Sequence, residues 1–280
     1  MDNLFTQFIN ERRYFRNLSE KTLKFYSETY HYFKEVGAFQ NLSKQSLQNA
    51  VVAFRERGAT TGGINAYIRG INVFLKWLHD EHGYENFSLK KIKGHQPVLR
   101  SLTDNELKAI VRFKPKTFSQ KRLHTALLLM IDTGLRVNEV LTLQRQKVDF
   151  DNLLLSVTGK GNKERIVPFS YGLRKVLFKY AEKQKFELLF CTDTGCKVRY
   201  RNLLRDFNDL MKKLKIEPDG AFHTFRRTFA TNYIRSGGNA LVLQRLLGHS
   251  TLQQSTAYVK LVTDDLQKEQ HRTSLLNRLR

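Results

Sequence analysis

The first ninety residues carry apolar side chains at the three- and four-residue steps of amphipathic helices. In SEKTLKFYSETYHYF, apolar and aromatic residues from Leu23 to Phe33 share one face, and Ser19 is placed to cap the helix. INAYIRGINVFLKWLHDEHG repeats the pattern and closes at Gly83. We expect these aromatic residues to pack in a core rather than to form a base-stacking platform. The pattern predicts a helical domain over residues 1–90.

The helical pattern stops in the stretch SLKKIKGHQPVLRS. It holds three lysines together with Gly94 and Pro97, and it shows no sustained apolar period. We interpret residues 91–100 as a basic linker between domains 1–90 and 101–280. A basic strap between two basic domains suits a clamp around DNA, although a merely solvated loop is the alternative.

Helices return in the second domain. Thr103 and Glu106 have the spacing of a capping box, so a helix should start there. LHTALLLMIDTG is apolar on nearly all sides, which predicts a buried helix that ends at Gly134. GLRVNEVLTL predicts a further helix with Val140 and Leu141 on its buried side.

The period then changes to that of β-strands. β-rich runs occupy 148–150, 153–158 and 165–167, separated by turn residues at 151–152 and 159–162. This pattern predicts a small antiparallel sheet inside a helical domain, so the fold class is mainly α. Helical patterns resume in the stretches 171–184 and 200–214, and then through 221–260.

The charge of the chain points to a polyanionic partner. Lysine and arginine outnumber acidic residues to give a formal charge of +22 and a pI of about 10.0. Nucleic acid is the first candidate and an anionic membrane surface the second. No apolar run approaches the roughly 20 residues of a membrane span, and the N-terminus does not read as a signal peptide. We therefore expect a soluble cytoplasmic protein.

The two cysteines, Cys191 and Cys196, are interpreted as reduced thiols. A zinc site needs about four ligands, and no second cysteine or histidine pair lies nearby at metal-binding spacing. We expect neither a metal nor another cofactor.

Three polar side chains of the helical segments are candidates for chemistry. Arg136 follows the Gly134 break, where it is either a functional group or a partner of Glu139 at i+3. His223 and Arg226 are also three residues apart, so they project from one helix face. Each of them alone is more often structural than catalytic.

Three further candidates are weaker when taken singly. Lys160 lies at the tip of the predicted hairpin, where a solvated charge is ordinary. His249 follows Gly248 at the end of a helix, where capping explains a histidine. Tyr258 is one of 11 tyrosines.

Taken together, these residues fall in motifs that occur in a recognisable order. TGLRVNEVLTL, GKGNKERIVP, HTFRRTFAT, LLGHS and TAYVK resemble the boxes of the tyrosine recombinase (phage integrase) family of site-specific DNA recombinases. The resemblance covers about Leu102 to Tyr258. Residues 1–90 resemble the helical core-binding domain of the family only in pattern.

The resemblance implies a fold and a site. The fold would be a two-domain C-shaped clamp with a helical catalytic domain. The implied catalytic residues are two arginines, a hairpin lysine, two histidines and a tyrosine nucleophile: Arg136, Lys160, His223, Arg226, His249 and Tyr258. Lys163 leaves open which hairpin lysine acts, and the family pattern favours Lys160. The position after Arg226 is often histidine in the family, whereas this chain has Arg227. We interpret this difference either as a neutral change or as an extra phosphate contact.

These residue types suit attack on a phosphodiester. A phenol has a pKa of about 10, so a histidine can help to remove its proton. Two guanidinium groups suit the charge on the non-bridging oxygens, where other enzymes use magnesium. An ammonium group can protonate the departing 5′ oxygen. A 3′-phosphotyrosyl intermediate would conserve the bond energy, so rejoining would need no ATP.

The resemblance favours a recombinase that serves integration, excision or resolution of a mobile element or replicon. It would act on double-stranded DNA as a homo-tetramer on two sites, with accessory DNA-bending or directionality proteins as further candidate partners. Two alternatives remain: a type IB topoisomerase-like enzyme that relaxes DNA, and an inactive DNA-binding relative.

Overall fold

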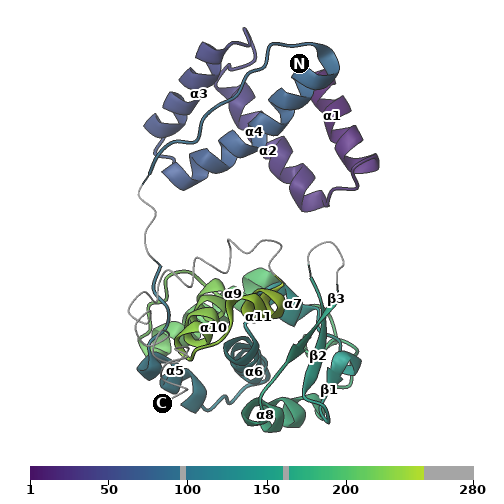
Figure 1. Ribbon diagram of the computed structural model, residues 1–280, viewed down its shortest axis with the longest axis vertical. Helices are drawn as coiled ribbons and strands as arrows, with labels where there is room; N and C mark the ends of the chain where they lie inside the picture. Colours follow the sequence, from purple (N-terminus) through teal and green to yellow (C-terminus); the bar gives the residue numbers. More distant parts are fainter. Residues whose placement is uncertain (95–98, 160–163, 249–280) are drawn as a thin grey trace, which may run out of the picture. The chain divides into compact units, whose positions relative to one another are not determined.

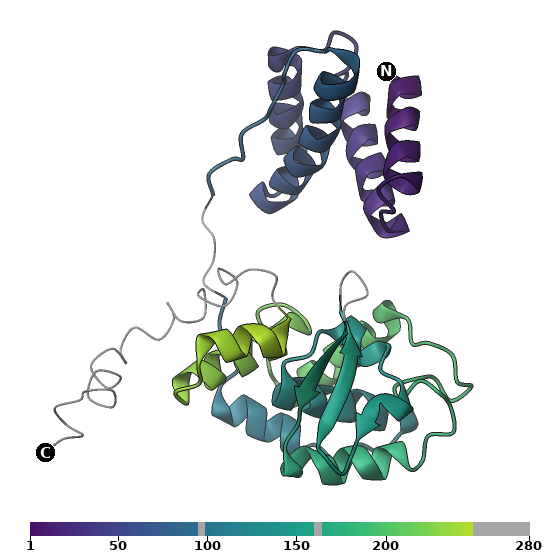
Figure 2. The ribbon, with the colours of Figure 1, turned by 45° about the vertical axis from the view of Figure 1, so that its right-hand side comes forward.

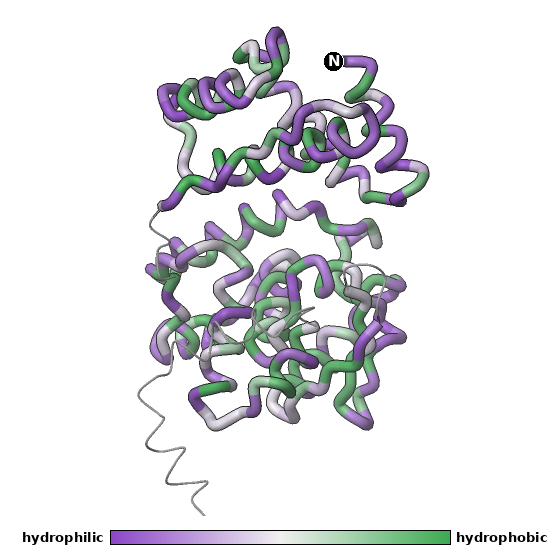
Figure 3. Tube along the Cα trace, turned by 45° about the horizontal axis from the view of Figure 1, so that its top comes forward, coloured by the Kyte–Doolittle hydropathy of each residue, from purple (hydrophilic) through white to green (hydrophobic). Residues whose placement is uncertain are grey.

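The chain divides into two compact units, Met1–Pro97 and Val98–Arg280. The structure, a computed structural model, describes residues 1–94, 99–159 and 164–248 (Figure 1). Hydrophobic and hydrophilic residues alternate along the helices of both units (Figure 3). The predicted C-shaped clamp concerns the relative placement of the units and stays a prediction.

The N-terminal unit is helical, and α4 packs against the other three helices. Ser19 Oγ accepts a hydrogen bond from the backbone of Thr22, as its capping position predicts. Phe8, Phe33 and Phe74 are fully buried, which confirms that the aromatic residues form a core. The helices are α1 (Asp2–Tyr14), α2 (Glu20–Glu35), α3 (Lys44–Glu56) and α4 (Thr61–His82).

The segment after α4 returns along that helix. The side-chain amide of Asn72 donates to Leu89 O at 2.9 Å and accepts from Leu89 N at 3.0 Å. Asn65 makes the same pair of bonds with Ile92, at 3.0 and 2.8 Å. The predicted basic linker therefore begins in a segment that is held on α4. Its residues 95–98 lie outside the described part of the chain.

The second unit is built around α6, which lies between α8 and the pair α10 and α11 in Figure 1. Most residues in the second half of α6 are buried, as its nearly uniform apolar pattern predicts. Thr103 and Glu106 form the expected capping box at the start of α5. The helices are α5 (Asp104–Arg112), α6 (Phe118–Thr133), α7 (Val137–Leu141), α8 (Tyr171–Ala181), α9 (Tyr200–Leu214), α10 (His223–Arg235) and α11 (Ala240–Leu247).

The predicted small sheet is present, with three antiparallel strands in the order β1-β2-β3 (Figure 2). A short 3₁₀ helix, η1 (Arg145–Lys147), precedes the sheet. Val157 pairs with Arg165 and Leu155 with Val167, so one face of β2 and β3 is turned to the core. The strands are β1 (Val148–Asp149), β2 (Leu154–Thr158) and β3 (Glu164–Pro168). These observations confirm a mainly helical fold with a small antiparallel sheet.

Two further sequence expectations concern cysteines and membrane spans. Cys191 is buried and Cys196 exposed, and both are free thiols. Within residues 1–94, 99–159 and 164–248, no helix is both long and apolar enough to cross a membrane.

Candidate active site

Arg136 is positioned by a tight turn between α6 and α7. Gly134 ends α6 in the left-handed region at φ +66°, where a glycine meets no steric penalty. A Cβ at this position would overlap the Phe229 ring and lie 2.8 Å from the side chain of Leu247. Arg136 is then the N-cap of α7, directly before Val137, the first residue of that helix.

The guanidinium groups of Arg136 and Arg226 meet at one backbone oxygen. Arg226 is only 4% exposed, and it donates to Gly134 O at 2.9 Å and to Leu247 O at 2.6 Å. Arg136 Nη1 donates to the same Leu247 oxygen at 3.3 Å. The sequence placed these two arginines in one site, and the structure brings them together at the end of α11.

Glu139 holds Arg136 from the other side. Its carboxylate accepts from Arg136 Nη1 at 3.0 Å and from the Arg136 backbone N–H at 2.8 Å. The i+3 ion pair that the sequence offered as a structural alternative therefore exists. This ion pair still leaves the Arg136 side chain able to bind a ligand, because 34% of its surface is exposed.

A third arginine, Arg165 of β3, completes this cluster. It donates two hydrogen bonds of 2.9 Å each to the carboxylate of Glu139. Its Nε also donates to Leu246 O at 3.0 Å. Sequence reasoning assigned no role to Arg165. The available signal was the alternation in β3, which puts Arg165 on the same face as the buried Val167.

The C-terminal end of α11 is therefore bound by three cationic side chains. Its last carbonyls carry the negative end of the helix dipole, which favours this arrangement. α11 ends at Gly248, which adopts the left-handed conformation at φ +62°. A Cβ on Gly248 would lie 3.1 Å from the side chain of Arg165, so this position also needs glycine.

Glu139 is ionised despite being only 5% exposed. Burial acts to raise the pKa of its carboxyl group. Hydrogen bonds from Arg165 and from the Arg136 backbone, together with the charges of both arginines, outweigh burial and hold the pKa below its ordinary value. A buried carboxylate between two arginines fixes their orientation and leaves the cluster with a net positive charge.

His223 begins α10, one turn before Arg226. Desolvation lowers the pKa of its imidazole, and the positive charges of Arg226, Arg136 and Arg227 lower it further. The neutral form is therefore favoured at neutral pH, which is the form that can accept a proton.

The other three sequence-predicted site residues, Lys160, His249 and Tyr258, lie outside the described residues, as does Lys163. Their place in the sequence is still informative. Lys160 falls between β2 and β3, and Arg165 is the second residue of β3. His249 directly follows Gly248, the residue that ends α11.

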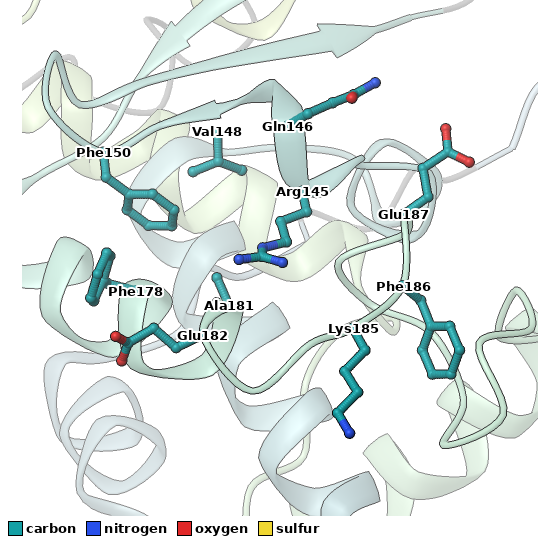
Figure 4. Close-up of a pocket in the computed structure, with 10 residues that line it drawn as sticks. All are labelled: Arg145, Gln146, Val148, Phe150, Phe178, Ala181, Glu182, Lys185, Phe186 and Glu187. Atoms are coloured by element: carbon teal, nitrogen blue, oxygen red, sulfur yellow. The ribbon is translucent and has the colours of Figure 1, made fainter.

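A separate groove of about 750 Å³ lies between η1, β1 and α8. Figure 4 shows Phe150 and Phe178 side by side along it, with Arg145, Glu182 and Lys185 nearby. None of its lining residues belongs to the cluster of Arg136 and Arg226. Within that cluster, the Arg136 side chain keeps 34% of its surface exposed, so a ligand can reach it from solution.

No group of three or more histidine, cysteine or acidic residues that could hold a metal ion occurs within the described ranges. The described cluster offers cationic donors, the guanidinium groups of Arg136 and Arg226. Two arginines can share the charge of a phosphate, and the imidazole of His223 lies on the same helix as Arg226, three residues before it.

The sequence of the second unit matches the model of the phage integrase family over residues 100–264, more than half of the chain. The chain belongs to this family. It is a tyrosine-type site-specific recombinase, an enzyme that cleaves and rejoins DNA.

Similar proteins agree with this assignment. The tyrosine recombinase XerA of Saccharolobus solfataricus is 33% identical over 211 residues, which cover 74% of this chain and 66% of that one. A tyrosine recombinase of Thermosipho africanus is 29% identical. The alignment covers 95% of the present chain and 97% of the Thermosipho protein. These relatives favour the recombinase interpretation over the topoisomerase-like alternative.

Solved structures share the fold of the recombinase. The integrase of transposon Tn1549, in complex with transposon right end DNA, matches with a TM-score of 0.81 at 17% identity. The match covers 97% of this chain and 98% of that chain. A lambda integrase dimer bound to a core site matches with a TM-score of 0.73 at 16% identity, over 92% and 94% of the two chains.

Proposed function

We propose that this recombinase cleaves DNA with Tyr258 and forms a covalent 3′-phosphotyrosyl intermediate. The observation that carries the proposal is the convergence of Arg136 and Arg226 on Leu247 O, with His223 one helical turn from Arg226. Leu247 lies two residues before His249 and eleven before Tyr258 in the sequence. Arg136 and Arg226 thus meet at a residue that precedes, in the sequence, the segment with the proposed nucleophile.

In the proposed reaction, His223 takes the phenolic proton of Tyr258 while the phenolate oxygen attacks phosphorus. Arg136 and Arg226 bind the non-bridging oxygens, where negative charge gathers in the transition state. Lys160 protonates the departing 5′ oxygen, and His249 donates to a phosphate oxygen. The P–O bond to the 5′ oxygen breaks as the P–O bond to Tyr258 forms. Reversal with a 5′ hydroxyl of another strand rejoins the DNA.

Double-stranded DNA is the proposed partner. The formal charge of +22 favours it, and both the Tn1549 integrase and the lambda integrase were solved with DNA. The helical N-terminal unit would bind the core site and the second unit would cleave it. The DNA substrate would place the activity in the cytoplasm, for integration, excision or resolution of a mobile element or replicon.

The proposed assembly is a tetramer on two DNA sites. The supporting observation is the sequence after Tyr258, which ends in residues 266–280 with four leucines, too few for a core of their own. These residues lie outside the described part of the chain. Docking of each tail on the next protomer would close a ring. Deleting residues 266–280 should preserve binding to a single site and abolish paired-site complexes on native gels. A truncated protein that still pairs sites and recombines them would contradict this assembly.

The function is tested in two steps, because the target sequence must be found first. A library of nicked duplexes with random cores is incubated with the enzyme, and the DNA that becomes covalently attached is sequenced. The selected site is then supplied on two labelled duplexes and on a supercoiled plasmid. Exchange of strands between the duplexes supports the proposal. Relaxation without site preference supports the topoisomerase-like alternative, and the absence of any covalent adduct supports an inactive DNA-binding protein.

A further inference from the structure

Arg227 fastens the beginning of the second unit to α10. Its Nε and Nη2 both donate to the carbonyl oxygen of Arg100, at 2.9 and 2.6 Å. Arg100 is 127 residues away in the sequence and is the second described residue after the segment 95–98 that joins the units. The Arg227 side chain therefore helps to hold the polypeptide at the point where it enters the unit that carries the candidate active site.

The next two residues are held by the same helix. Ser101 Oγ donates to Thr231 Oγ1 at 3.0 Å, and the backbone N–H of Leu102 donates to Thr228 Oγ1 at 2.9 Å. Both threonines are buried, and Leu102 is part of the main core of the unit. The segment 100–102 thus follows α10 through three successive residues.

The loop before α10 is tied into the same contact. Arg227 Nη2 donates to Asp219 O at 2.9 Å and to Thr224 Oγ1 at 2.6 Å. Asp219 Oδ2 in turn accepts the backbone N–H of Arg100 at 2.7 Å. Arg227 and Asp219 therefore hold Arg100 through its carbonyl and its N–H together.

Arg226 and Arg227 are neighbours in the sequence, but their side chains bind different parts of the second unit. Arg226 reaches the carbonyls of Gly134 and Leu247, within the candidate site. Arg227 reaches the carbonyls of Arg100 and Asp219, within the segment that enters the unit. The first turns of α10 are therefore bonded to the active-site cluster on one side and to the entering segment on the other. The interpretation of Arg227 as an extra phosphate contact does not account for this geometry, because its guanidinium is directed at backbone carbonyls and a hydroxyl group.

We propose that Arg227 is a positioning residue, which locks the segment 100–102 to the helix that carries His223 and Arg226. Cleavage would depend on this lock because α10 sets the positions of both catalytic candidates. The proposal rests on the catalytic roles proposed above for His223 and Arg226. It assigns the departure from the family pattern at position 227 to internal anchoring instead of DNA contact.

The test compares Arg227→Met and Arg227→Lys with the wild-type full-length chain. Arg227→Met keeps the length of the side chain and removes its donors and charge, whereas Arg227→Lys keeps the charge with fewer donors. Arg235→Met is the matched control, since Arg235 is an exposed arginine in the last turn of the same helix. Single-turnover cleavage is measured on a nicked duplex at saturating protein, and binding to the same duplex is measured at several salt concentrations.

We expect Arg227→Met to cleave about 10- to 100-fold more slowly, the scale for a misplaced catalytic group. Its DNA affinity and the slope of log K against log salt should stay within error of the wild type. Arg227→Lys should recover part of the rate, and Arg235→Met should cleave normally. A slope that falls by about one unit in Arg227→Met would identify a phosphate contact and overturn the proposal. An unchanged cleavage rate in Arg227→Met would overturn it as well.

Two measurements separate this proposal from a stability effect and from failure of the proposed function. Circular dichroism and thermal unfolding select a temperature at which every variant is fully folded, and the rates are compared there. Tyr258→Phe is run in parallel. If the wild type makes no adduct, or if Tyr258→Phe makes one, the proposed function fails irrespective of Arg227. If the wild type cleaves through Tyr258 and Arg227→Met cleaves at the same rate, only the positioning role of Arg227 fails.

Discussion

Arg165 donates two parallel hydrogen bonds of 2.9 Å to the carboxylate of Glu139, 26 residues before it in the chain. This pair joins β3 to α7, and Glu139 also binds Arg136. The hairpin that includes Lys160 in its sequence is therefore bonded through its second strand to the residue that orients Arg136. Bidentate arginine–carboxylate pairs fix geometry as well as charge, so this pair is suited to holding β3 and α7 in a fixed relative position.

Replacing the buried carboxylate should damage catalysis more than DNA binding. Glu139→Gln keeps the shape of the side chain, but it removes the charge and replaces one acceptor by a donor that faces a guanidinium. We expect cleavage to fall at least about tenfold through misplacement of Arg136, with DNA affinity little changed. Single-turnover cleavage and filter binding measure the two effects. Glu182→Gln, at an exposed position of the same unit, is the control. Equal cleavage by both variants would contradict the orienting role of Glu139.

Arg136 and Arg226 should be needed for the chemical step even when the positive charge is kept. Arg136→Lys and Arg226→Lys remove the planar fork that can bind two phosphate oxygens. Loss of one preorganised donor costs about 2.7–4 kcal/mol in comparable sites, which is about a hundredfold to a thousandfold in rate. His223→Ala should be milder if water replaces the base. These rates are measured in single turnover at saturating DNA. A wild-type rate in either lysine variant would remove that arginine from the catalytic set.

The pH dependence of cleavage should report the neutral imidazole of His223. Its pKa is lowered from the ordinary value of 6.5, by desolvation first and by the neighbouring arginines second. The base form is present above this lowered pKa, so the rate should rise with pH through an acidic limb that lies below 6.5. Cleavage at subsaturating DNA is the appropriate measurement, because it reflects the free enzyme. The limb should disappear in His223→Ala, and a limb centred above 6.5 would contradict the assignment.

The ion pair between Arg100 and Glu106 should contribute stability that depends on pH. Arg100 donates two hydrogen bonds to Glu106, and they lower the pKa of the Glu106 carboxyl to about 2. A lowered folded-state pKa stabilises the fold above the unfolded value of 4.5, and this contribution is lost as the pH falls from there towards about 2. Glu106→Gln should therefore cost about 2 kcal/mol at pH 7, the scale of hydrogen bonds to charged groups, and much less near pH 2. Urea unfolding at both pH values measures this, and an equal loss at both would contradict the pKa assignment.

The sequence predicted the features of the fold that depend on close neighbours in the chain. Ser19 and Thr103 cap helices through bonds to residues three positions away. Gly134 and Gly83 end helices because a left-handed residue is needed there. The change from a helical to a β-strand pattern of apolar residues after Leu143 predicted the small antiparallel sheet. These features are local, so composition and spacing are enough to predict them.

The contacts that build the site could not be predicted in the same way. Arg136 reaches Leu247 O across 111 residues, and Arg227 reaches Arg100 O across 127 residues. Both acceptors are backbone carbonyl groups. Every residue has such a group, so the residue type at these positions does not predict the contact. The motifs singled out Arg136 and Arg226 as candidates through their resemblance to a family. Only the fold shows that Arg226 binds Leu247 O in the candidate site, whereas Arg227 binds Arg100 O.

Tyr258 is the residue that we propose becomes joined to DNA. Tyr258→Phe keeps the aromatic ring and removes only the hydroxyl oxygen that would bond to phosphorus. The decisive measurement is denaturing electrophoresis of wild-type and Tyr258→Phe protein after incubation with a labelled, nicked duplex. We predict a covalent adduct for the wild type and none for Tyr258→Phe at equal DNA binding. An adduct of undiminished yield on Tyr258→Phe would contradict the account.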